Sequence, residues 1–219
     1  MVPPATGADE TPQAVGILVQ GLNRVYALAA HGGFGFKGAA ETAESYRRPG
    51  IDTEDAIRNF VNAQIVKASA VGFVTNLGGL ITLPVALPAS LTGALYIQLN
   101  MVTGIAHLRG YDINSDHVRT GALVCLAGGG VARLLRDAGV QIGTKLTEQA
   151  IRKVSAAALT RINQAVGFRL ASKAGATGIA RLSMIVPLVG GLVGGTLDGT
   201  ATKAIATVAR RWFPAVHPP

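Results

Sequence analysis

The chain has 219 residues, of which 49% are hydrophobic and only 15% are charged, and its mean hydropathy is +0.37. This length fits one domain. The net charge of +8 is unevenly distributed, because residues 1–66 carry five basic and seven acidic residues and residues 67–219 carry fifteen and five. Such a basic body suits anionic phospholipid. Because the basic residues form no run longer than two and aromatic residues are scarce, we expect no nucleic-acid partner.

Two composition features limit the classes of site. The only cysteine, Cys125, excludes an intramolecular disulfide framework and a zinc site built from several cysteines, and its apolar context indicates a small buried side chain. We expect neither a cofactor nor a metal. The acidic N-terminus lacks the basic region of a secretory signal, which predicts a location in the cytosol or on the cytosolic side of a membrane.

In chain order, residues 1–10 are expected to be a disordered lead, residues 11–213 a single helical domain and residues 214–219 a Pro-rich tail. Thr11-Pro12 is a good helix start. The Gly-rich segment that begins at His31 is expected to be a loop with a short helix at 39–47, and no strand is expected anywhere. Asp52 and the acidic residues after it open a second helix.

The most distinctive stretch is Ala68 to Leu108, which contains no charged residue. Lys67 precedes it and Arg109 follows it. Its length suits two bilayer spans of about 20 residues each, or a helical hairpin buried inside an all-α domain. Amide, Gly and Pro residues make each half only marginal as a span. We therefore predict a bent hairpin that either dips into a membrane or is covered by its neighbours.

Glycine and proline mark where this hairpin bends. Gly78-Gly79 predicts a break or a close helix crossing, and Pro84 and Pro88 predict a kink. A helix is expected from about Pro88 to Arg109. Gly110 would be its C-cap, followed by a turn at Tyr111-Asp112. Ser115 is a plausible N-cap for the next helix, which we expect at 120–132.

The last third of the chain has two further helical patterns. Residues 144–174 form a long amphipathic pattern with scattered basic residues, typical of a solvated helix face or of a membrane-surface helix. Residues 182–197 are uncharged and carry two overlapping G-x-x-x-G spacings, formed by Gly190, Gly191, Gly194 and Gly195. Such a bare face permits close helix contact, to lipid, to the hairpin or in a homo-oligomer. A helix with a basic end follows.

Candidate catalytic residues are few. If the protein is an enzyme, His107, Asp112 and His117 are the clustered polar candidates, and the reaction class would be lipid hydrolysis. Their spacing matches no metal-binding or nucleophile motif. The alternative for Asp112 is an ordinary role in a turn or a helix cap.

Two blocks carry a resemblance to a known family. Residues 72–112 combine a Gly-Gly pair, a Leu-Pro segment, a second Pro, a helix with Gln, and a closing Gly-Tyr-Asp. Residues 185–213 combine a Pro, a Gly-rich helix and a basic end. Together they resemble the EcsC-like proteins over about residues 55–215. One departure is Ala89-Ser90, where relatives often carry an acid after the second Pro.

The resemblance implies an all-helical fold with a membrane or lipid connection and no established reaction. We therefore expect a compact helical bundle around the bent apolar hairpin, with a Gly-rich helix pair at the C-terminus. The leading hypothesis is a non-enzymatic protein that contacts anionic lipid on the cytosolic side, bound peripherally or partly inserted. Its lipid-contact residues would be Gly78, Gly79, Pro84, Pro88, Gly190, Gly191, Gly194 and Gly195. The alternatives are a soluble carrier of a fatty acid or lipid, a lipid hydrolase, and an interaction module for a membrane transporter.

Overall fold

The structure, a computed structural model, describes residues 12–71, 89–127, 155–174 and 190–215. At positions 12–18, 71, 89–91, 127, 167–174 and 190–198 within these ranges, it describes the backbone alone. The described residues form seven helices that pack against one another, so the predicted all-α fold is confirmed. The helices are α1 (Pro12–His31), α2 (Ala39–Glu44), α3 (Thr53–Val71), α4 (Ala89–Leu108), α5 (Asp116–Ala127), α8 (Ala156–Ala174) and α10 (Gly190–Trp212).

The starts of three helices follow local sequence signals. Helix α1 begins at Pro12, whose missing N–H is not needed at a first helical position. Asp52 caps α3, because its Oδ1 accepts a hydrogen bond from the N–H of Asp55 at 2.7 Å. The Oγ of Ser115 accepts a hydrogen bond from the N–H of Val118 at 3.3 Å and so caps α5, which starts earlier than the predicted residue 120.

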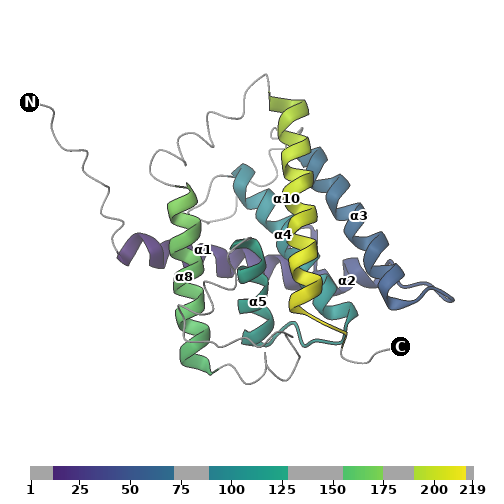
Figure 1. Cartoon of the computed structure of the whole chain (residues 1–219), viewed down its shortest axis with the longest axis horizontal. Coiled ribbons are helices and arrows are strands. Elements are labelled where there is room, and N and C mark those ends of the chain that lie inside the picture. Colours follow the sequence, from purple (N-terminus) through teal and green to yellow (C-terminus); the bar gives the residue numbers. More distant parts are fainter. Residues whose placement is uncertain (1–11, 72–88, 128–154, 175–189, 216–219) are drawn as a thin grey trace, which may run out of the picture.

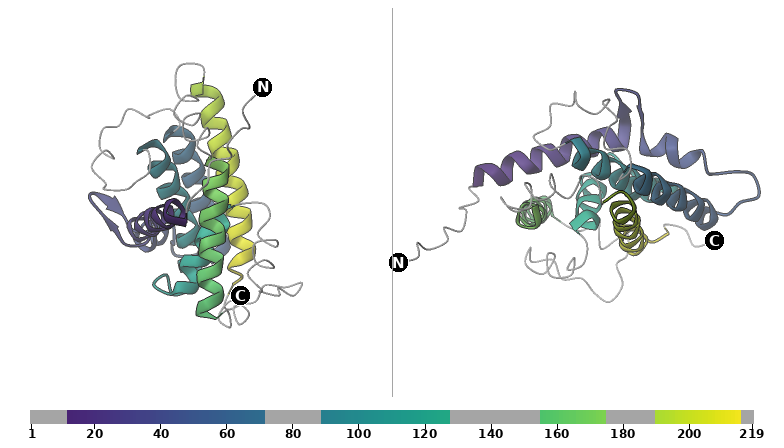
Figure 2. Two further views of the ribbon diagram at one scale, coloured as in Figure 1. Left: turned by 90° about the vertical axis from the view of Figure 1, so that its left-hand side faces the viewer. Right: turned by 90° about the horizontal axis from the view of Figure 1, so that it is seen from above.

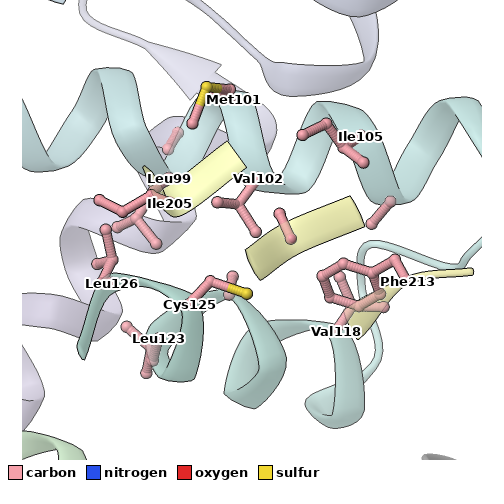
Figure 3. Packing of buried hydrophobic residues seen from close by; sticks show 14 of the residues in the cluster. Leu99, Met101, Val102, Ile105, Val118, Leu123, Cys125, Leu126, Ile205 and Phe213 are labelled. Carbon is pink, nitrogen blue, oxygen red and sulfur yellow. The ribbon is translucent and has the colours of Figure 1, made fainter. Parts of the chain in front are cut away.

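Helix α4 lies at the centre of the bundle and contacts α1, α2, α3, α5 and α10 (Figure 1). It is apolar on almost every side because it is covered on almost every side. Figure 3 shows its core residues packed against α5, α10 and Phe213. The labelled side chains there are Leu99, Met101, Val102, Ile105, Val118, Leu123, Cys125, Leu126, Ile205 and Phe213.

Helices α3 and α10 run antiparallel beside each other, and both contact α4. They approach closely at Gly199, where a Cβ atom would lie 2.6 Å from the Oγ of Ser69. In the two views of Figure 2, α8 and α10 lie on one side of the molecule and α1 on the other, with α4 between them. Helix α8 covers α1 and α5.

One local prediction is wrong. The Gly-rich segment after α1 is not a plain loop, because Gly32–Gly33 (β1) and Phe36–Lys37 (β2) pair as a short antiparallel hairpin. Its loop is Phe34-Gly35. Two-residue strands are too short to give an alternating pattern in the sequence, so they left no period-two signal.

Several predictions concern residues outside the described part of the chain. These are the kink at Gly78, Gly79, Pro84 and Pro88, residues 128–154 and residues 175–189. Of the long amphipathic pattern at 144–174, α8 covers the portion from Ala156.

Candidate functional site

The two ends of the bundle differ in their chemistry, and each contains residues that the sequence singled out. We call the end that holds Thr53, Leu108 and Trp212 the lower end, after its position in Figure 1. The opposite end, where α3 stops and where α4 and α10 start, is the upper end.

At the lower end, α4 ends in a Schellman turn. The N–H of Gly110 donates to the carbonyl of His107 at 2.9 Å, and the N–H of Tyr111 donates to that of Ala106 at 3.0 Å. Gly110 has φ +83°, a conformation that suits glycine. The predicted C-cap is therefore confirmed, and it turns the chain so that Arg109 and Tyr111 point into the lower end.

Arg109 joins three helices. Its guanidinium makes a forked ion pair with Glu54 of α3, with Nη2 at 2.7 and 2.8 Å from the two carboxylate oxygens. Its Nη1 donates to the carbonyl of Arg210 at 2.6 Å and to the carbonyl of Phe213, both at the end of α10. The Arg109 side chain is only 8% exposed, whereas that of Glu54 is 51% exposed. We call this group of contacts the Arg109 clamp.

Two tyrosines close the same end. The hydroxyl of Tyr111 donates to the carbonyl of Pro214 at 2.9 Å, and its ring lies edge-on to Phe213. The hydroxyl of Tyr26 in α1 donates to the carbonyl of Ile113 in the turn at 2.7 Å. Burial raises the pKa of Tyr26 to about 12. The turn predicted at Gly110, Tyr111 and Asp112 is thus a structural junction.

The three candidate catalytic residues have separate surroundings. The Nε2 of His107 lies 3.0 Å from a carboxylate oxygen of Glu44 in α2. The Oδ1 of Asp112 accepts a hydrogen bond from the N–H of Asn114 at 2.9 Å, which is the turn role. His117 lies half-buried in the first turn of α5. Within the described residues, no three His, Cys, Asp or Glu side chains gather closely enough to hold a metal ion.

Three helix ends converge at the upper end (Figure 1). Residues 72–88 connect the end of α3 at Val71 to the start of α4 at Ala89, and residues 175–189 lead to the start of α10 at Gly190. The connecting stretch 72–88 belongs to the uncharged run, and the uncharged residues 182–197 extend into α10. Both uncharged runs therefore enter or leave the described bundle at one end.

The exposed side chains at this end include apolar, basic and neutral polar ones, with Thr200 beside Gly199 among the last. Val66 in the last turns of α3 is 67% exposed, and Lys67 beside it is also exposed. Lys203 on α10 is exposed one turn after Gly199, where α10 meets α3. Neither lysine forms an ion pair with another described residue.

Several basic residues elsewhere are paired with acidic ones. Described ion pairs involve Lys37 with Glu41, Arg47 and His107 with Glu44, Arg58 with Asp55, Arg109 with Glu54, and Arg119 with Asp116. These pairs neutralise acidic residues of α2 and of the starts of α3 and α5, whereas Lys67 near the end of α3 forms no ion pair with a described side chain.

The glycines predicted to contact lipid are only partly described. Gly190, Gly191, Gly194 and Gly195 lie in the first turns of α10, where the structure describes the backbone alone. Gly78, Gly79, Pro84 and Pro88 lie outside the described residues. None of the described helices is both long and apolar enough to cross a membrane.

Sequence reasoning missed the Arg109 clamp. The sequence marks Arg109 only as the charged border of the apolar run, although Glu54 lies in an acidic first turn. A lone Arg directly before a Gly C-cap, at the end of a long uncharged helix, is the one signal that could have suggested a buried structural role.

The comparisons with known proteins give one match. The family model described as the EcsC protein family matches residues 41–214. Neither the curated proteins nor the solved structures contain a match to the chain. The match starts in α2 and ends just after the Arg109 clamp, so it covers most of the bundle. The chain therefore belongs to the EcsC protein family.

Proposed function

We propose that this protein binds the cytosolic surface of a membrane that contains anionic lipid, and that the upper end of the bundle faces the lipid. The observation that carries the proposal is the convergence of the α3, α4 and α10 ends at one place. It brings two uncharged segments of the chain to the same end of the molecule.

Lack of charge is what makes this end suitable for lipid. Moving an ionised side chain into an apolar environment is costly, so a surface that enters the headgroup region must have few of them. Residues 72–88 carry none. Val66, which borders them, is one of the two large hydrophobic side chains that are exposed in the described part of the chain.

The unpaired lysines supply the electrostatic part of the attraction. Lys67 lies one turn before the end of α3, and Lys203 lies along α10, one turn after its contact with α3 at Gly199; both are exposed. A basic residue close to an anionic membrane contributes about 1 kcal/mol, and the attraction weakens within a Debye length as salt is added. Two such residues therefore contribute about 2 kcal/mol, a factor of about 30 in affinity.

The lower end is less suitable because the polar groups of its central contacts already have partners. The guanidinium of Arg109 donates to Glu54 and to two carbonyls. The carboxylate of Asp112 accepts a hydrogen bond within the turn. A ligand there would have to break these contacts before it could make new ones.

The test is binding to vesicles of phosphatidylcholine with and without phosphatidylglycerol, followed by co-sedimentation. We expect binding to the anionic vesicles that decreases with salt. The double variant Lys67→Gln, Lys203→Gln should bind about 30-fold more weakly. The matched control is Arg48→Gln, Arg211→Gln, which removes two exposed charges that are unpaired within the described residues and lie away from the upper end.

The control should bind like the unmodified protein. Equal weakening by both double variants would mean that net charge alone matters, and it would contradict a specific upper-end contact. Failure of the unmodified protein to bind either vesicle would overturn the proposal. Lipid that co-purifies from detergent-free extract without vesicle binding would instead favour the carrier.

A further inference from the structure

The hairpin between α1 and α2 carries an unusual residue at its tip. Phe34 and Gly35 form the two-residue loop, with φ +52° and +84°. Two-residue loops of this type require positive φ at both central positions, so Asn-Gly or Gly-Gly is the usual pair. Phenylalanine in this conformation is strained, because its Cβ crowds the backbone.

The same residue is also unusually exposed. Phe34 is 84% exposed, although phenylalanine is a side chain that proteins normally bury. Phe34 is thus unusual both in the backbone conformation it adopts and in the exposure of its side chain. Strained positions of this kind tend to cluster at functional sites, where the surrounding structure holds them in place.

The base of the hairpin is held by the core. The hydroxyl of Tyr96 donates to the carbonyl of Lys37 at 2.8 Å, and the side-chain amide of Asn100 donates to the same carbonyl at 3.2 Å. Asn100 also donates to the carbonyl of Ala29 at 2.9 Å and accepts from Gln64 at 3.0 Å. Both α1 and β2 are therefore anchored to α4 by one buried amide.

A ring contact adds to this anchorage. Phe36 packs on the ring of Tyr96, with ring centroids 4.8 Å apart. Gly32 and Gly38 permit close backbone contacts at the hairpin base, because a Cβ at Gly32 would lie 2.6 Å from the carbonyl oxygen of Phe36. The side chain of Phe34 is thus presented on a fixed support.

The surroundings of the tip suit a membrane interface. Residues 32–36 carry no charge, and His31 and Lys37 lie exposed at the base. The ammonium group of Lys37 pairs with the carboxylate of Glu41 in α2 at 2.8 Å, which neutralises that acid. In the left view of Figure 2, the hairpin projects at mid-height from the side where α1 lies, and the upper ends of α3, α4 and α10 lie at the top. A flat surface that meets both therefore lies obliquely, across the top of the molecule and its α1 side.

We propose that Phe34 is an aromatic anchor that inserts into the headgroup region of the bilayer that the upper end contacts. The inference rests on the proposed membrane function and adds a second contact point to it. An aromatic ring in the interface contributes apolar burial without needing a hydrogen-bond partner. A fixed hairpin loses little conformational entropy on insertion, which favours binding.

The experiment compares Phe34→Asn and Phe34→Trp with the unmodified protein on phosphatidylcholine vesicles that contain phosphatidylglycerol. Asn tolerates positive φ, so Phe34→Asn should melt at the same or a higher temperature, which separates lost binding from lost folding. It should bind the vesicles about tenfold more weakly, because part of the apolar burial of a phenylalanine is lost. Phe34→Trp should bind like the unmodified protein.

The Phe34→Trp variant also reports where the hairpin tip lies. The native Trp212 is buried, so emission from the exposed indole that the substitution introduces is visible above it. That emission should shift to the blue on vesicle addition and be quenched by brominated lipid. If Phe34→Asn binds as tightly as the unmodified protein and the emission of Phe34→Trp does not shift, the proposed role of Phe34 is wrong. The proposed membrane binding by the upper end would still hold.

The remaining outcomes contradict the anchor in other ways. If the unmodified protein binds no vesicles, both proposals fail. If Phe34→Asn binds vesicles normally but shifts the protein from dimer to monomer in light scattering, the hairpin contacts a second copy instead of lipid.

Discussion

The lower and upper ends of the bundle are held together in opposite ways. At the lower end, residues far apart in the chain meet through directed polar contacts, with Arg109 and Tyr111 reaching the last residues of α10 and the chain just after it. At the upper end, the described contact between α3 and α10 is a close approach at Gly199. The uncharged run 68–108 begins at this contact on α3, and the uncharged run 182–197 ends just before it on α10.

This difference indicates a division of roles. The polar contacts of the lower end need accurate geometry, so they fix how the helices are arranged. The upper end carries small and apolar residues with few charges among them, which leaves it suited to an apolar partner. We infer that substitutions at the lower end mainly change stability and that those at the upper end mainly change binding.

The largest expected effect comes from breaking the Arg109 clamp. Arg109→Ala leaves Glu54 without this partner and leaves the carbonyls of Arg210 and Phe213 without this donor. We expect a loss of about 4 kcal/mol in the free energy of unfolding, from about 2 kcal/mol for the ion pair and about 1 kcal/mol for each carbonyl bond. Urea denaturation followed by circular dichroism measures it.

The matched control is Arg58→Ala. Arg58 also pairs with a carboxylate of α3, that of Asp55, but at an exposed position. Its loss should cost less than about 1 kcal/mol. If the two variants lose equal stability, the Arg109 clamp is no more than a surface ion pair.

The second effect is a pH dependence at the lower end. The pKa of Tyr26 is raised to about 12, mainly because burial disfavours the charged phenolate. In the unfolded chain this hydroxyl ionises near pH 10, so the unfolded state binds fewer protons above that pH. The stabilising contribution is therefore complete below about pH 10 and is lost as the pH rises toward about 12, by about 2 to 3 kcal/mol.

Tyr26→Phe isolates this contribution. At about pH 8 the variant should be less stable by about 1 kcal/mol, because the hydrogen bond to Ile113 is lost. Between about pH 10 and 12 its stability should fall less steeply than that of the unmodified protein. Parallel pH profiles for the two proteins would contradict the burial of the Tyr26 hydroxyl.

The same substitution, glycine to alanine, can be made at one glycine of each end to compare the two. At the lower end, a Cβ on Gly121 would fall well inside contact distance of the indole nitrogen of Trp212, and the buried indole cannot move freely. Gly121→Ala should cost about 2 kcal/mol. At the upper end, the group that Gly199→Ala would meet is the hydroxyl of Ser69, which can rotate.

Gly199→Ala should therefore change stability by less than about 1 kcal/mol, because the better helix propensity of alanine offsets the contact. Thermal melts of both variants test the comparison. A larger loss for Gly199→Ala than for Gly121→Ala would reverse our account of which end depends on close packing.

Local signals in the sequence predicted much of the fold. Gly110 and Ser115 act on backbone groups within a few residues, so their capping roles could be predicted from the sequence alone. The uncharged helix ending at Leu108 was also predictable, because its length and the charged residue that follows it can be read from one continuous segment of the sequence.

Long-range pairings could not be predicted in this way. Glu54 and Arg109 lie in different parts of the chain, and no periodicity relates them. Lys37 is similar, since its carbonyl is a hydrogen-bond acceptor for two side chains of α4. The hairpin with Phe34 was missed because its strands are only two residues long.

The central claim is that the upper end, and not the lower end, faces the membrane. A direct measurement attaches an environment-sensitive fluorophore to Val66→Cys or, as the control, to Arg211→Cys at the end of α10. Burial raises the pKa of the native Cys125 thiol, so the label should react at the exposed new cysteine. On anionic vesicles, we predict a blue shift for the probe at position 66 and none at position 211. A shift at position 211 with none at position 66 would contradict the account.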